Sequence, residues 1–98
     1  MQALAAQLPT EDEQRTLALE VASVVRASGP VREYMGEPIQ VEVEAWHSKG
    51  GVAVAELRVG GPRSASDARA SFARMGERWR LLHASIEALP GVVISPSS

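Results

Sequence analysis

Two histidines, His47 and His83, are the residues of this chain best suited to metal or proton chemistry, because the chain has no cysteine. A zinc site would need both imidazoles together with carboxylates from elsewhere in the fold. Alternation along the segment that holds His47 puts Glu42 and Glu44 on the opposite face from it. His83 falls inside an apolar run and is expected to pack as a partly buried residue. We therefore predict no metal ion and no cofactor.

The sequence supports nucleophilic catalysis no better than it supports a metal site. Ser71, His83 and Asp67 carry the groups of a hydrolase triad, but no Gly-x-Ser-x-Gly turn presents the serine. Glu37 and Glu42 could be paired as an acid and a base, yet solvated strand ends explain them better. The glycine pairs at 50–51 and 60–61 adjoin strands rather than helix starts, so they suit turns and not a phosphate loop. We predict no catalytic residue and no enzymatic activity.

Composition narrows the classes of partner. The 98 residues carry a net charge of -2, and the basic residues are spread over several segments. Binding to nucleic acid needs a concentrated basic surface, so no nucleic-acid partner is expected. No run reaches the ~20 apolar residues that cross a bilayer. The chain as given is expected to be soluble, in the bacterial cytoplasm or associated with a membrane. Membrane association would require a segment that this chain does not contain.

The elements that position these residues begin with a helix. Thr10 and Glu13 have the spacing of a capping box, and acidic residues fill the first turn. The helix is expected to run to about Ala27, and a second, short helix is expected over 31–35 after Ser28-Gly29-Pro30. The positions predicted to face the core from the first helix recur with helical spacing. They are Leu17, Val21, Val24 and Val25.

Two strands follow, joined by a hairpin loop at 48–51. In the first strand, Trp46 has the parity of Glu42 and Glu44, which predicts that it lies on the face away from the core. With a loop over 49–51, Trp46 is expected opposite Val54 and Glu42 opposite Arg58. The core faces of the two strands are expected to be formed by Ile39, Val41, Val43 and Ala45, and by Ala53, Ala55, Leu57 and Val59.

The remaining segments are less regular. Segment 63–75 could be capped as a helix, but its alternation favours a strand with Phe72 buried and Arg69 exposed. A strand over 77–86 follows, with Trp79 in the core and a bulge near Leu81-Leu82. A turn at Pro90-Gly91 and a short strand over 92–94 complete the chain.

Together these elements predict an α+β fold. Two N-terminal helices, one long and one short, pack on a four- to five-stranded antiparallel sheet. The domain is expected to span residues 10–95, with a flexible lead-in over 1–9 and a disordered tail over 96–98. The sheet side of the core is expected to comprise Ile39, Val41, Val43, Ala55, Leu57, Val59, Phe72 and Trp79.

Three segments in order resemble a known family. They are Val31–Ile39, which ends in Met-Gly-Glu-Pro-Ile, then Gly51–Pro62, which ends in Gly-Gly-Pro, and Gly76–Leu81, which contains Gly-Glu-Arg-Trp. Over about residues 14–95 the chain resembles the bacterial relatives of cytochrome oxidase complex assembly protein one. That family is related in fold to the Tim twenty-one type subunit of the mitochondrial presequence translocase. The resemblance implies a domain that acts by contact with other proteins, and it supplies no catalytic residues.

The sequence therefore favours a non-enzymatic protein-interaction or assembly-factor module. The predicted contact patch is an exposed apolar surface with a charged rim. Its residues are Trp46, Val52 and Val54, rimmed by Glu44, Glu56 and Arg58. Two alternatives stay open. One is a small-ligand-binding cone of the cystatin-like or nuclear-transport-factor-like kind, and the other is a structural homodimer built through an edge strand.

Overall fold

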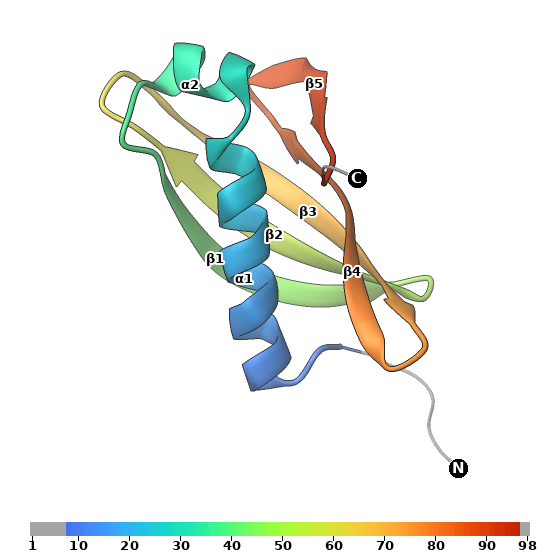
Figure 1. Ribbon diagram of the computed structural model, residues 1–98. Helices are drawn as coiled ribbons and strands as arrows, with labels where there is room; N and C mark the ends of the chain where they lie inside the picture. The colour runs from blue at the N-terminus through green and yellow to red at the C-terminus, as the bar shows by residue number, and fades with distance from the viewer. Residues whose placement is uncertain (1–7, 97–98) are drawn as a thin grey trace.

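The computed structural model describes residues 8–96, which form two helices and then a meander of five strands (Figure 1). Neighbouring strands pair antiparallel in the order β1-β2-β3-β4-β5, which confirms the predicted α+β fold. Residues 1–7 of the expected lead-in and 97–98 of the expected tail lie outside the described residues. The elements are α1 (Glu11–Arg26), α2 (Gly29–Met35), β1 (Gln40–Lys49), β2 (Val52–Gly60), β3 (Ala65–Met75), β4 (Arg78–Ile86) and β5 (Leu89–Ile94).

Helix α1 begins with the predicted capping box. The backbone N–H of Glu13 donates to Thr10 Oγ1 at 3.2 Å, and the N–H of Thr10 donates to Glu13 Oε1 at 2.8 Å. These two bonds satisfy donors that the first turn of a helix leaves without intrahelical partners. Leu17, Val21 and Val25 are buried on one face, as their spacing predicts. The cap therefore fixes where α1 begins, and the apolar face fixes how α1 sits on the sheet.

Hydrogen bonds from three arginines connect α2 and the segments on either side of it to the rest of the fold. Arg32 Nη1 donates to the carbonyl oxygen of Arg26 at 3.1 Å, across the bend between the helices. Arg26 Nε donates to the carbonyl oxygen of Ile39 at 2.9 Å, ahead of β1. The backbone N–H of Arg63 donates to the carbonyl oxygen of Met35 at 2.8 Å. The bonds to Arg26 and Met35 satisfy carbonyls at helix ends, and together the three bonds hold α2 over one end of the sheet.

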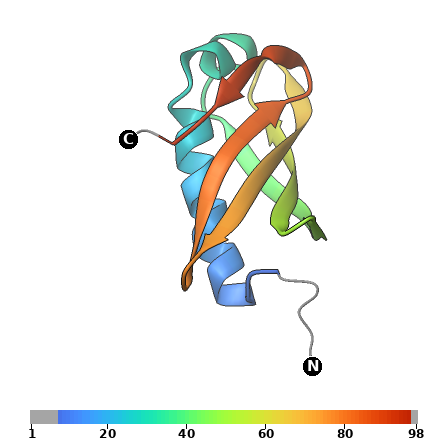
Figure 2. The same ribbon diagram turned by 90° about the vertical axis from the view of Figure 1, so that its right-hand side faces the viewer.

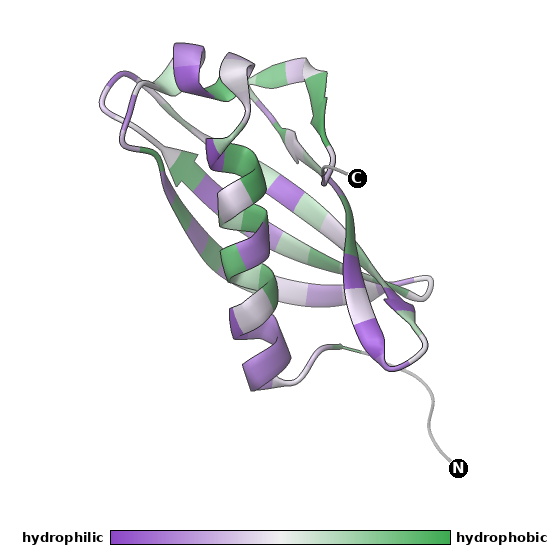
Figure 3. Ribbon diagram, in the orientation of Figure 1, coloured by the Kyte–Doolittle hydropathy of each residue, from purple (hydrophilic) through white to green (hydrophobic). Residues whose placement is uncertain are grey.

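The core lies between α1 and the sheet, and the alternating hydropathy of the strands is plain in Figure 3. Phe72 is fully buried and Arg69 is exposed, so the prediction that segment 63–75 contains a strand is confirmed. Trp79 is buried with 8% of its surface exposed, as expected of a core residue. The predicted sheet side of the core is present, with Val41 and Val43 only partly buried.

The prediction that Trp46 faces away from the core is wrong. The β1–β2 register shifts between Val43 and Ala45, so that β1 has one residue more than β2 at this point. Such a bulge reverses which residues of a strand face each side. Trp46 therefore pairs with Ala55 and packs against the core, whereas Ala45, expected in the core, pairs with Glu56 and is exposed.

The loop of this hairpin is also shorter than expected. Lys49 pairs with Val52, so only Gly50 and Gly51 form the turn, and their φ angles are 58° and 82°. Positive φ at both positions is the geometry of a tight two-residue hairpin, which glycine adopts without strain. The pairing of Glu42 with Arg58 is as predicted because the bulge compensates for the shorter loop.

The predicted bulge in β4 is confirmed, because the β3–β4 register shifts where Ser71 pairs with His83 and Phe72 pairs with Leu81. Trp79, Leu81, Ala84 and Ile86 are all buried as a result. His83 is exposed, which corrects the expectation that it packs in the core.

The final turn lies before Pro90 and Gly91 rather than at them. Glu87 and Ala88 form the turn, and Ile86 pairs with Leu89. The N–H of Glu87 donates to the carbonyl oxygen of Asp67 at 2.9 Å, and the N–H of Ala88 donates to Ser66 Oγ at 3.0 Å. These bonds to β3 satisfy the turn's backbone donors, a tertiary effect that local turn residues do not reveal.

Candidate functional site

The sheet has two faces of different character. Helix α1 lies along one face, and among the described residues no helix or strand lies over the other, called here the outer face (Figures 1 and 2). Alternation along the strands, corrected for the bulges, determines its membership. The outer face includes Gln40, Glu42, Ala45, His47, Lys49, Val52, Val54, Glu56, Arg58, Asp67, Arg69, Ser71, Ala73, Arg80, His83 and Ser85.

Four of these residues form a row straight across the sheet. His47 pairs with Val54, Val54 with Ser71, and Ser71 with His83, on β1 to β4. Val54 and Ser71 are half-buried, whereas the two histidines are exposed. The row lies in a hollow of about 550 Å³ that also reaches Lys49. Small side chains in the middle and larger ones at the sides give the hollow its shape.

One carboxylate beside the row, that of Glu56, lies close to both a histidine and an arginine. Glu56 Oε2 lies 2.9 Å from His47 Nε2 and 3.6 Å from Arg69 Nε. The hollow is lined by two cations, Lys49 and Arg69, against the single carboxylate of Glu56. With neutral histidines this leaves one positive charge in excess, in a chain whose net charge is -2. The hollow is therefore suited to a partner group that carries negative charge.

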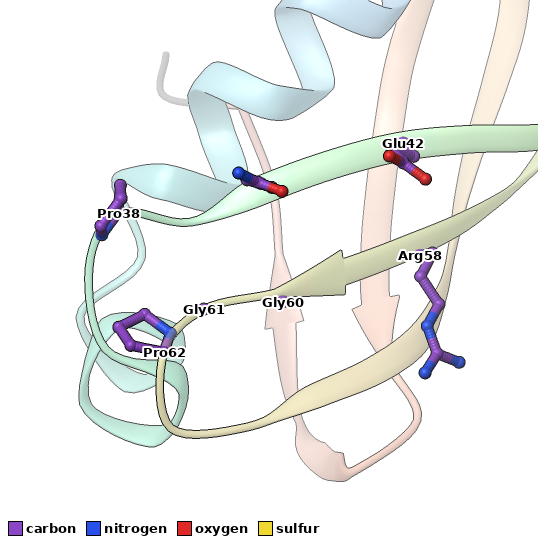
Figure 4. Close-up of a pocket in the computed structure, with 7 residues that line it drawn as sticks. Pro38, Glu42, Arg58, Gly60, Gly61 and Pro62 are labelled. Atoms are coloured by element: carbon purple, nitrogen blue, oxygen red, sulfur yellow. The ribbon is translucent and has the colours of Figure 1, made fainter.

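A second hollow, of about 450 Å³, opens near Pro38 and Gly60 at the far end of β1 and β2 (Figure 4). Figure 4 shows the guanidinium of Arg58 directed away from Glu42. Arg58 Nη1 instead lies 3.0 Å from Asp67 Oδ1 on β3. Because this arginine already has a carboxylate partner, the charge left without an ion pair among residues 8–96 in this hollow is the carboxylate of Glu42, opposite in sign to the excess charge around Ser71.

The structure divides the predicted contact patch. Val52, Val54, Glu56 and Arg58 share the outer face as expected. Trp46 lies on the opposite face because of the bulge, and Glu44 lies in the bulge itself. His47 takes the outer-face position next to Val54 that alternation had assigned to Trp46.

Trp46 is half-buried near the open edge of the sheet. Its ring centre lies 5.3 Å from that of Phe72, with the planes tilted by 36°. A tilted pair at this distance is a favourable aromatic contact. A shallow groove of about 450 Å³ runs past Trp46 and Val43, with Gln14 and Ala18 of α1 as its other wall. Trp46 is thus part of the core and of this groove at once.

Sequence reasoning missed the row because three of its members were assigned elsewhere. Alternation placed His47 on the face opposite Glu42, whereas the bulge brings both residues to the outer face. His83 was expected in the core, and Ser71 was considered only for a triad. The structure places Ser71 directly opposite His83, but Asp67 pairs with Arg58 instead of His83. Backbone N–H groups in the middle of a sheet are used in strand pairing, so they offer no oxyanion hole here. The alternation of β3 and the bulge in β4 were the signals that could have located both residues.

Within residues 8–96, no group of three or more histidine or acidic side chains is arranged to hold a metal ion. Nor is any helix in that range long and apolar enough to cross a membrane. The chain matches no family model, and no curated protein or solved structure matches it significantly. The resemblance to the assembly-factor family therefore stays a prediction.

Proposed function

We propose that this chain is a non-enzymatic protein-interaction module of the assembly-factor kind, which uses the outer face of its sheet to contact a protein partner. One observation carries the proposal: the row from His47 to His83 aligns four strands into a shallow hollow over which no described element lies. Its half-buried centre at Val54 and Ser71, flanked by charged and polar side chains, matches the pattern of an interface, in which a less polar centre is surrounded by a polar rim.

The charges of the hollow indicate the chemistry of the partner. Lys49 and Arg69 outnumber Glu56, so a complementary surface would bring carboxylates to the rim and a small apolar group over Val52 and Val54. Complementary charges mainly raise the rate of association and exclude wrong partners. We infer a partner segment that is acidic, and the resemblance adds the expectation that it belongs to a complex under assembly.

The ligand-binding alternative has less support. The space between α1 and the sheet is filled by buried apolar side chains, among them Phe72, Met35 and Leu57. A small-ligand cone would need room there, with converging polar groups. The hollows described above open instead at the surface of the domain.

A pair of substitutions at Ser71 tests the proposal in the native host. Ser71→Glu places a negative charge in the hollow and should abolish partner capture, because it repels carboxylates. Ser71→Lys occupies similar space with the opposite charge and should retain capture. The readout is quantitative affinity capture of each variant, after circular dichroism has shown that both remain folded.

The matched control is Leu19→Lys, because Leu19 is 69% exposed on α1, away from the outer face. This variant should capture the same proteins as the wild-type chain. Equal capture by Ser71→Glu and Ser71→Lys would contradict an acidic partner. If Leu19→Lys loses capture while both Ser71 variants retain it, the partner contacts α1 rather than the outer face.

A further inference from the structure

Strand β1 forms one edge of the sheet and is ten residues long (Figure 1). Its inner side pairs with β2, so half of its backbone N–H and C=O groups point away from the sheet. No described strand pairs with this edge, and an unpaired edge of this length is a template for another strand.

The register determines which residues present these backbone groups. Lys49 and Val52 flank the two-residue turn, so they form a hydrogen-bonded pair. Alternation then directs the N–H and C=O groups of Ser48 and Trp46 outward, and beyond the bulge those of Val43. These residues can therefore bond to an added strand without breaking any bond to β2.

Three charged side chains on β1 lack an ion-pair partner among residues 8–96. Glu42, Glu44 and Lys49 form no ion pair with any residue of the described range 8–96, whereas Arg58 and Arg69 each do. Acidic side chains precede Trp46 and basic ones follow it. The strand is thus complementary in charge to a reversed copy of itself.

We propose that β1 pairs antiparallel with β1 of a second copy of this chain, about a two-fold axis at Trp46. Counting Glu44 and Ala45 as one position, since both oppose Glu56, keeps every pair on a common face. Trp46 then lies opposite Trp46 of the second copy, and Ser48 lies opposite Val43. On the outer face Lys49 meets Glu42 of the second copy in both symmetry-related pairs.

The groove beside Trp46 provides room for this arrangement. It runs between the β1 edge and α1 and is bounded by Val43, Trp46 and Ala18. The second copy's Trp46 would enter it from the edge and cover apolar surface that is open in the single chain. The aromatic pair contributes beyond its buried area, and each opposite-charge pair across strands adds a smaller term.

Pairing would join the two five-stranded sheets into one continuous sheet with both outer faces on the same side. This inference rests on the backbone and charges of β1, and it does not depend on the proposed contact through the outer face. Its consequence for that proposal is that the dimer would present two hollows to partners.

A charge swap measured by sedimentation velocity tests the pairing on the purified full chain. The wild-type chain should reach twice its monomer mass of 10.4 kDa with rising concentration. Lys49→Glu and Glu42→Lys each oppose like charges in both symmetry-related pairs. Each should raise the dissociation constant at least about tenfold, equivalent to about 1.4 kcal/mol. The double variant recreates both pairs in reverse and should restore dimerisation.

A backbone variant tests the hydrogen bonds independently of charge. Ser48→Pro removes an outward N–H that β2 does not use, and should leave a folded monomer. Ser48→Ala keeps the N–H and should still dimerise. Circular dichroism checks the folding of each variant. A wild-type chain that stays monomeric at the highest soluble concentration overturns the proposal, as does a double variant that fails to recover dimerisation.

Discussion

At the scale of single residues, the tightest constraint lies at Gly61. A Cβ there would come within 2.5 Å of the carbonyl oxygens of both Met35 and Gly36. The loop after β2 can approach the end of α2 only because this residue has no side chain. The close approach also places the N–H of Arg63 at the carbonyl oxygen of Met35. Gly61 therefore joins α2 to the sheet and helps to shape the hollow at that end of the outer face.

Gly61→Ala should accordingly lower the free energy of unfolding by about 3 kcal/mol, the upper end of what overpacking usually costs. The matched control is Gly29→Ala, where a Cβ would meet nothing within 4 Å and the residue begins α2. That change should be neutral or stabilising by a few tenths of a kcal/mol. Chemical denaturation of both variants measures the difference, and equal stabilities would show that the α2 contact is not constraining.

For Trp46, strict alternation along the strand predicts the wrong face of the sheet. Strict alternation places it with Glu42 and Glu44, and nothing in Glu44-Ala45 announces a bulge, because both residues are compatible with an exposed strand position. The bulge brings Trp46 onto Phe72 and leaves a small alanine exposed instead. Burying the tryptophan removes more apolar surface from water than burying the alanine would, so this arrangement is the more stable one. It depends on packing against other strands, which the local sequence pattern does not contain.

At the scale of elements, the features predicted correctly are those with local causes. The capping box begins α1, and uninterrupted alternation defines β2 and β3. The bulge in β4 was also detectable, because Leu81 and Ala84 have incompatible parity in a regular strand. The turn at Glu87-Ala88 was not, since it depends on Ser66 and on the carbonyl oxygen of Asp67 from another strand. The outer-face site was located only in part for the same reason, because its row depends on registers across four strands.

The bulge in β1 predicts an unusual tolerance to deletion. Removing Glu44 leaves Ala45 alone opposite Glu56, so Trp46 and Val43 both keep their present faces. The shortened chain should remain folded, with a free energy of unfolding within about 1 kcal/mol of the original, since only an exposed residue is lost.

Deleting Glu42 is the matched control for this element. It would bring Val41 to the outer-face position opposite Arg58 and remove its packing from the core. This variant should lose about 2 kcal/mol or more. Urea denaturation followed by tryptophan fluorescence compares the two. Greater damage from the loss of Glu44 than of Glu42 would show that the bulge itself is required for folding.

At the scale of the whole molecule, the two faces of the sheet have different surroundings within residues 8–96. One face buries the core under α1, and α2 closes one end of the sheet. The outer face contains the hollow around Ser71, and the β1 edge pairs with no other described strand. A domain built in this way can be contacted over a broad surface without any change in its core. We therefore propose that a partner meets the outer face rather than the helices.

Site-specific photo-cross-linking in the native host tests that claim most directly. A photoreactive side chain at Ser71 lies in the middle of the hollow, and the same group at Leu19 lies on the exposed surface of α1. We expect a discrete adduct with an acidic protein from position 71 and none from position 19, with both variants folded. An adduct from position 19 without one from position 71 would show that the partner contacts α1 instead of the outer face.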